Sequence, residues 1–220
     1  MPTPSETRRT ALGVSFTVGL YGVAFGAAGV AAGFSVWQTC LFSLLAFTGA
    51  SQFAAVGVVA AGGNPLSAVS TAALVGTRNA LYGLQMAPVV QSSGWRRLLA
   101  AQLTIDESTS VSLVQAPLGA GAMRAGFWLT GAGVYIFWNI FTVAGALGAS
   151  ALGNPAGWGL DAAVPAAFLG LLWPRLTTPY LRAVAAVSVV VALLLTPLMA
   201  PGLATISTAV VAIVMGWRER

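Results

Sequence analysis

The chain is a series of long apolar stretches separated by short polar connectors. None of the stretches alternates apolar and polar residues as a half-buried strand does, and most approach the roughly 20 residues that a helix needs to cross a bilayer. Backbone groups inside a membrane must be bonded within the segment, which also favours helices. The predicted helices are Ala11–Gly33, Trp37–Ala61, Leu66–Val90, Leu98–Ala116, Phe127–Ala149, Ala162–Trp173, Ala183–Leu198 and Gly202–Met215.

Composition supports this interpretation and excludes most soluble classes. The 220 residues are 57% hydrophobic and only 7% charged, whereas a soluble domain carries about 25% charged residues. All 10 basic residues are arginine, and they face 5 acids with no histidine. So few charges cannot cover a water-exposed surface. We therefore expect an all-α, polytopic integral membrane protein of about 7–8 transmembrane or broken helices, forming a single domain over residues 1–220.

The arginines indicate the partner and the orientation. They are scattered along the chain, so they predict contact with membrane lipid and not with nucleic acid. With eight crossings, seven arginines lie on the side of both termini, which predicts cytoplasmic termini. The pair Arg96–Arg97 is the exception, and a re-entrant segment within residues 62–97 would explain it. The apolar run that follows Arg8 and Arg9 is too long for a secretory signal.

The missing residue types exclude most catalytic chemistry. The chain has no histidine and a single cysteine, Cys40, so it lacks the residues for histidine-ligated metals, paired-cysteine sites and histidine-based triads. We expect no metal, no cofactor and no enzymatic activity. The glycine pairs Gly22/Gly26 and Gly29/Gly33 have the small-xxx-small spacing that lets helices pack closely.

Polar residues inside the apolar runs indicate the functional site, because an ionisable group at membrane depth costs about 2.5–3.5 kcal/mol. The first cluster, Thr48–Gln52, predicts an opened helix in which Ser51 and Gln52 offer side-chain donors. The alternative is a continuous helix in which Gln52 is bonded to a neighbour.

The second cluster contains Arg78, Asn79 and Tyr82, and the third contains Asp106 and Glu107. Arg78 and Tyr82 share a helix face, and the planar guanidinium of Arg78 matches a carboxylate of the protein or of a substrate. The adjacent acids point about 100° apart on a helix, so one of them can face a cavity. The alternatives are an arginine that reaches the membrane surface, and a static arginine–acid pair that joins helices.

Two further features have open interpretations. Asp161 either caps the helix that follows it or belongs to a site, and that helix is short and contains Pro165. Such short, proline-bounded segments are typical of transporter sites. Trp138 and Asn139 lie in the middle of an apolar run, where Trp138 either packs in the core or forms the wall of a substrate cavity.

Four motifs resemble the AzlC family, the large subunits of bacterial branched-chain amino-acid exporters. They follow one another in the order of the family and cover nearly the whole chain. Many members carry Asn-Leu-Arg-His before the Leu-Tyr of the second motif, whereas this chain has Val75-Gly-Thr-Arg-Asn79. Any role of that histidine is therefore absent or taken by Asn79. The motifs are Phe47–Phe53, Thr77–Gly83, Leu103–Ser108 and Gly159–Leu169.

The resemblance implies export of valine, leucine, isoleucine or related amino acids across a bacterial inner membrane, together with a small AzlD-type membrane subunit. A zwitterion needs a cationic or helix-N-terminal contact for its carboxylate and an anionic contact for its ammonium. We expect Arg78 and the opened helix to meet the carboxylate, and Asp106 or Glu107 to meet the ammonium or carry a proton. The alternative is a scaffold subunit whose charges are structural ion pairs, and a membrane enzyme is a more distant one.

Overall fold

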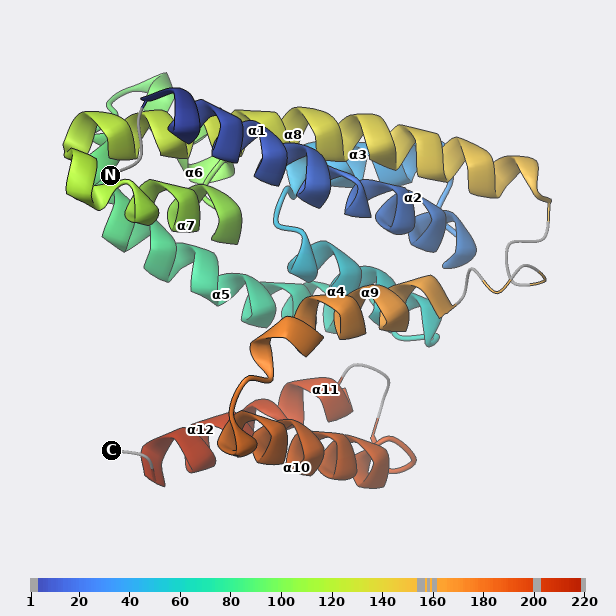
Figure 1. Ribbon diagram of the computed structural model, residues 1–220. Helices are drawn as coiled ribbons and strands as arrows, with labels where there is room; N and C mark the ends of the chain where they lie inside the picture. Colours follow the sequence, from blue (N-terminus) through green and yellow to red (C-terminus); the bar gives the residue numbers. More distant parts are fainter. Residues whose placement is uncertain (1–3, 154–156, 158, 160–161, 200–202, 219–220) are drawn as a thin grey trace.

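A computed structural model describes residues 4–153, 157, 159, 162–199 and 203–218, and all the regular elements in these ranges are helices (Figure 1). The all-α expectation is confirmed, and each predicted run contains helix. The α-helices are α1 Pro4–Gly19, α2 Tyr21–Ala31, α3 Val36–Leu45, α4 Ala50–Ala60, α5 Pro65–Val90, α6 Trp95–Gln102, α7 Asp106–Val114, α8 Ala120–Ala151, α9 Ala163–Leu172, α10 Pro179–Leu195, α11 Leu203–Ser207 and α12 Ala209–Arg218. Two short 3₁₀ helices are η1 Ala116–Leu118 and η4 Trp173–Arg175.

The long helix α8 organises the first layer of the fold. It runs beside α1 and α2, which follow each other almost in line, and α3 packs against it as well (Figure 1). A second layer contains α4, α5 and α9, and the link from α3 to α4 passes from one layer to the other (Figure 1). Helices α10–α12 lie beyond α9.

Glycines allow α2 and α8 to pack in backbone contact. A Cβ added at Gly22 would overlap the carbonyl oxygen of Trp138, and one at Gly26 would overlap that of Thr142. The close-packing face predicted from these two glycines is thus confirmed. Gly29 packs on Thr39 of α3, whereas Gly33 has a positive φ of +93° and open space around it, so Gly33 is a turn residue.

Several of the predicted runs contain more than one helix, and two of them, Trp37–Ala61 and Leu98–Ala116, are broken by links of several non-helical residues. Trp37–Ala61 breaks between Leu45 and Ala50, close to the predicted opening, so Ser51 and Gln52 lie in the first turn of α4. Leu98–Ala116 breaks between Gln102 and Asp106, and the sequence pattern did not predict this interruption. By contrast, α5 is continuous over 26 residues, so the re-entrant segment expected within residues 62–97 does not turn back inside residues 65–90.

Length and hydropathy single out two stretches, Glu6–Ala31 and Ala120–Ala151, as long and apolar enough to cross a membrane within the described chain. Hydroxyl groups join these helices to their neighbours in the interior: Ser15 donates to the carbonyl of Thr130, and Ser43 pairs with Thr142. Large apolar side chains such as Leu66, Leu84 and Leu193 are exposed on the outside. Interior hydroxyls and exterior leucines are typical of helices that pack within lipid.

Candidate functional site

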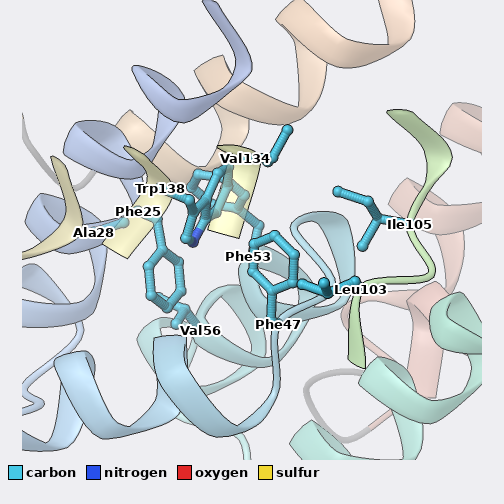
Figure 2. Packing of buried hydrophobic residues seen from close by; sticks show 9 residues of the cluster. All are labelled: Phe25, Ala28, Phe47, Phe53, Val56, Leu103, Ile105, Val134 and Trp138. Carbon is cyan, nitrogen blue, oxygen red and sulfur yellow. The ribbon is translucent and has the colours of Figure 1, made fainter. Parts of the chain in front are cut away.

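The two helix breaks meet at an aromatic core. Trp138 of α8 is 3% exposed and stacks on Phe25, with ring centroids 6.0 Å apart, while Phe53 meets it edge-on at 6.1 Å. Phe47 from the first break and Ile105 from the second belong to the same cluster (Figure 2). Segments far apart in the sequence are therefore brought to one place by burial of their apolar side chains.

A cavity of about 240 Å³ lies beside this core, and we call it the first cavity. It is somewhat smaller than the ~300–1,000 Å³ of sites for drug-sized ligands, so its volume suits a small molecule. Both breaks, α1, α2, α5, α8 and the α9–η4 segment contribute to it. Its lining residues are Val18, Tyr21, Phe47, Thr48, Gly49, Ala50, Val75, Arg78, Ile105, Asp106, Glu107, Val134, Trp138, Leu172 and Arg175.

An ion pair lines the first cavity. Nη2 of Arg78 lies 2.8 Å from Oδ2 of Asp106, and the side chains are 28% and 17% exposed. Two further polar atoms of the pair, Nε of Arg78 and Oδ1 of Asp106, are buried without a hydrogen-bond partner. The hydroxyl of Tyr82 lies close to the Asp106 carboxylate. Because buried polar groups are costly when unpartnered, these atoms are suited to bonding a polar ligand or water.

Each break is held by a side chain that caps the helix following it. Gln52 Oε1 accepts from the Gly49 N–H at 3.0 Å, and Ser108 Oγ accepts from the Ile105 N–H at 3.1 Å. The hydroxyl of Ser108 also donates to the carbonyl of Leu103 at 2.6 Å. Local hydrogen bonds of this kind satisfy the backbone at a helix terminus, so the openings are specified structures.

Groups of both charge signs line the first cavity. The first turn of α4 carries no acid, so its positive helix end and the guanidinium of Arg78 are cationic groups at the cavity. The first turn of α7 supplies the anionic groups, which are Asp106, paired with Arg78, and Glu107. Among the described residues, no arginine forms an ion pair with Glu107. An arrangement with both signs in one small space can hold a molecule that carries both charges.

The cavity brings together the predicted residues Arg78, Asp106, Glu107 and Trp138. Two further predictions, Ser51 and Gln52, line a different and larger cavity on another side of α4.

Three further predicted residues, Tyr82, Asn79 and Asn139, line neither cavity. Tyr82 is beside Asp106 without lining the first cavity. Asn79 lines neither cavity, and Asn139 uses its amide nitrogen to donate to the carbonyl of Tyr135 at 2.8 Å. Asp161 lies outside the described residues, so its two interpretations stay open.

The sequence pointed to the short segment of α9 but did not identify the two residues near its end that line the first cavity. Leu172 at its end and Arg175 in η4 both line the first cavity. Arg175 was counted among the arginines that flank the membrane, although the short segment bounded by Pro165 and Pro174 was itself a pointer to the site. Among the described residues, no group of three or more histidine, cysteine or acidic side chains could hold a metal ion.

Comparison with known proteins gives one match. A family model described as "AzlC protein" matches residues 13–152, a range that includes both helix breaks, Arg78 and the two acids of α7. No curated protein and no solved structure matches the chain.

Proposed function

The chain belongs to the AzlC family, which is associated with branched-chain amino-acid transport, and from this premise we propose that it is a secondary transporter exporting valine-like amino acids across the bacterial inner membrane. The family and the long apolar helices together indicate a membrane protein. The excess of arginine on the side of both termini supports cytoplasmic termini.

The observation that carries the proposal is that groups of both charge signs line the first cavity. Arg78 and the N-terminus of α4 suit an amino-acid carboxylate, and Asp106 or Glu107 suits the ammonium group. Trp138 and Val134 offer an apolar wall for an aliphatic side chain. Discontinuous helices that meet around a small cavity with a few charged groups are typical of secondary transporters.

The ion pair suggests how the substrate is admitted. With no substrate present, Arg78 and Asp106 neutralise each other across 2.8 Å. A zwitterion can replace both halves of this pair, because its carboxylate takes the place of Asp106 and its ammonium the place of Arg78. Substrate binding would then weaken the link between α5 and α7, and rocking of the helices around the breaks would follow. Asp106 or Glu107 would carry any coupled proton.

A small AzlD-type membrane subunit is part of the proposal, since the family resemblance implies one. Exposed apolar helices such as α5 and α10 leave surfaces for such a subunit and for lipid. We propose no catalytic role, because the chain has no histidine to act as a base and a single cysteine.

Transport of radiolabelled L-valine by proteoliposomes tests the proposal, with and without the small subunit. Arg78→Ala and Asp106→Asn should each lower the rate at least tenfold, which corresponds to about 1.4 kcal/mol of lost stabilisation. Arg97→Ala is the matched control, because Arg97 is exposed on α6 and lines neither cavity. Parental transport by Arg78→Ala and Asp106→Asn, at unchanged protein level, would show that the assigned roles are wrong.

The preformed ion pair also favours a second candidate function, a scaffold subunit in which Arg78 and Asp106 only join helices. Direct binding separates the two functions. A transporter should be stabilised against heat by L-valine, since a ligand stabilises the state that it binds. Absence of both binding and transport, in folded protein with its small subunit, would favour the scaffold.

A further inference from the structure

A second cavity, of about 860 Å³, lies between α3, α4 and α5. Its walls are largely apolar and include Phe42, Val59 and Ala68, and none of the described residues that line it is charged. Thr48 lines both cavities, so they lie on two sides of the same helix break. In the fold, this break is where the chain passes from the layer of α3 to the layer of α4 (Figure 1).

Two unpartnered donors line the second cavity. Gln52 is 0% exposed. Its Oε1 accepts a hydrogen bond from the Gly49 N–H, whereas its Nε2 has no partner. Ser51 is 6% exposed, and its Oγ also has no partner. The hydroxyl of Ser51 faces α5, since a Cβ added at Gly76 would lie 3.3 Å from it. Buried polar groups in native proteins are nearly always bonded, so these atoms indicate a ligand with acceptor oxygens.

The position of the two donors adds a positive field. Ser51 and Gln52 lie in the first turn of α4, a helix of 11 residues. Free backbone N–H groups and the positive end of the dipole are found at such a helix start, which is a favourable place for a carboxylate. An acceptor group at this end and an apolar body along the walls describe an amphiphilic small molecule.

We propose that the second cavity is a second binding station for the transported amino acid, in series with the first cavity across Thr48 and Gly49. The side chains of Ser51 and Gln52, through Oγ and Nε2, hold its carboxylate, and the walls formed by α3 and α5 hold its side chain. This inference rests on the proposed transport function. Since no charged side chain lines the station to meet the ammonium, it binds the amino acid more weakly than the first cavity does.

Substitution of Gln52 by glutamate is the sharpest variant. Gln52→Glu keeps an oxygen to accept from the Gly49 N–H, so the break stays capped, while the donor Nε2 becomes a second oxygen that repels a carboxylate. A second variant, Ala73→Trp, fills the station from α5, because Ala73 is exposed and lines it. Ala80→Trp is its matched control: Ala80 is also exposed, lies two turns further along α5 and lines neither cavity.

The experiment measures equilibrium binding of radiolabelled L-valine to the purified full-length chain, with circular dichroism as a check of folding. We expect the parent chain and Ala80→Trp to bind valine at a tight and a weak site. Gln52→Glu and Ala73→Trp should lose the weak site, at least tenfold in affinity, and keep the tight one within about twofold. Arg78→Ala should do the reverse.

Two results would overturn the inference in distinguishable ways. A single valine site that Arg78→Ala removes, and that both Gln52→Glu and Ala73→Trp leave unchanged, would refute the second station alone. The cavity would then belong to lipid or to a helix of another subunit. Absence of saturable valine binding in the folded parent chain would refute the proposed function as well.

Discussion

Arg78, in the middle of the unbroken helix α5, is paired at 2.8 Å with Asp106, the first residue of α7. The pair therefore connects a continuous helix to the start of an interrupted one, directly at the first cavity. Both side chains are mostly withdrawn from solvent, so neither charge is compensated by water alone. This relationship leads to a prediction about stability that is separate from transport.

Removal of one partner should destabilise the fold more than removal of both. Arg78→Ala leaves the Asp106 carboxylate without its cation, at a cost of up to about 3 kcal/mol, the lower end of the range for breaking buried pairs. The double variant Arg78→Leu/Asp106→Leu removes both charges and should recover most of that loss. Thermal unfolding in one detergent gives the comparison. Equal losses in the single and double variants would show that the pair contributes through packing and not through charge.

Substitution of Gly49 should destabilise the fold because of its backbone conformation, and steric overlap with neighbouring atoms should contribute little. Its φ is +62°, and an added Cβ would meet nothing closer than a ring carbon of Trp138 at 4.0 Å. We expect Gly49→Ala to lose about 1–3 kcal/mol through this positive-φ backbone conformation alone. The control Gly83→Ala, on helix α5 with no neighbour within 4 Å, should be neutral or slightly stabilising. A neutral Gly49→Ala in thermal unfolding would mean that the break adopts another backbone path.

Helix α8 offers a matched pair of glycines for testing its contact with α2. A Cβ at Gly145 would overlap the carbonyl oxygen of Val23, whereas Gly148 has nothing within 4 Å. Overpacking of a close contact costs about 1–3 kcal/mol, so Gly145→Ala should lower the melting temperature and Gly148→Ala should not. Equal melting temperatures for the two variants would contradict the close packing of α2 on α8.

The helical segments could be predicted from hydropathy alone, because the length and pattern of the apolar runs indicate helices without any knowledge of tertiary contacts. The opening near Gly49 could also be predicted, since small and polar residues gather in the middle of an apolar run. The break before Asp106 was missed for a physical reason. It depends on Ser108 bonding back to Ile105 and Leu103, and serine is just as common in uninterrupted membrane helices.

The site was only partly accessible from sequence. Arg78 and Asp106 were identified because charge is expensive inside an apolar run, and one of the two alternatives raised for them, an arginine–acid pair, is present. Their shared cavity could not be inferred, because it depends on packing between segments far apart in the chain. For the same reason the sequence did not indicate that Arg175 lines the first cavity. It also grouped Ser51 and Gln52 with Arg78, although these two residues line the second cavity.

Trp138 combines two of the interpretations that the sequence left open, since it packs in the aromatic core and lines the first cavity. Its Nε1 has no partner, so loss of the indole N–H leaves no protein group unpaired. Trp138→Phe keeps an aromatic ring against Phe25 and Phe53 and should cost less than about 1.5 kcal/mol, whereas Trp138→Ala should cost about 3–5 kcal/mol.

Ligand binding by the same two variants separates the cavity-wall role of Trp138 from its packing role. If the ring forms the apolar wall for the substrate side chain, Trp138→Phe should bind L-valine within about threefold of the parent, because most of the apolar surface is kept. Any Trp138→Ala protein that folds should bind it at least tenfold more weakly. Circular dichroism at the temperature of the binding assay verifies folding. Parental valine affinity in folded Trp138→Ala would assign Trp138 to core packing alone.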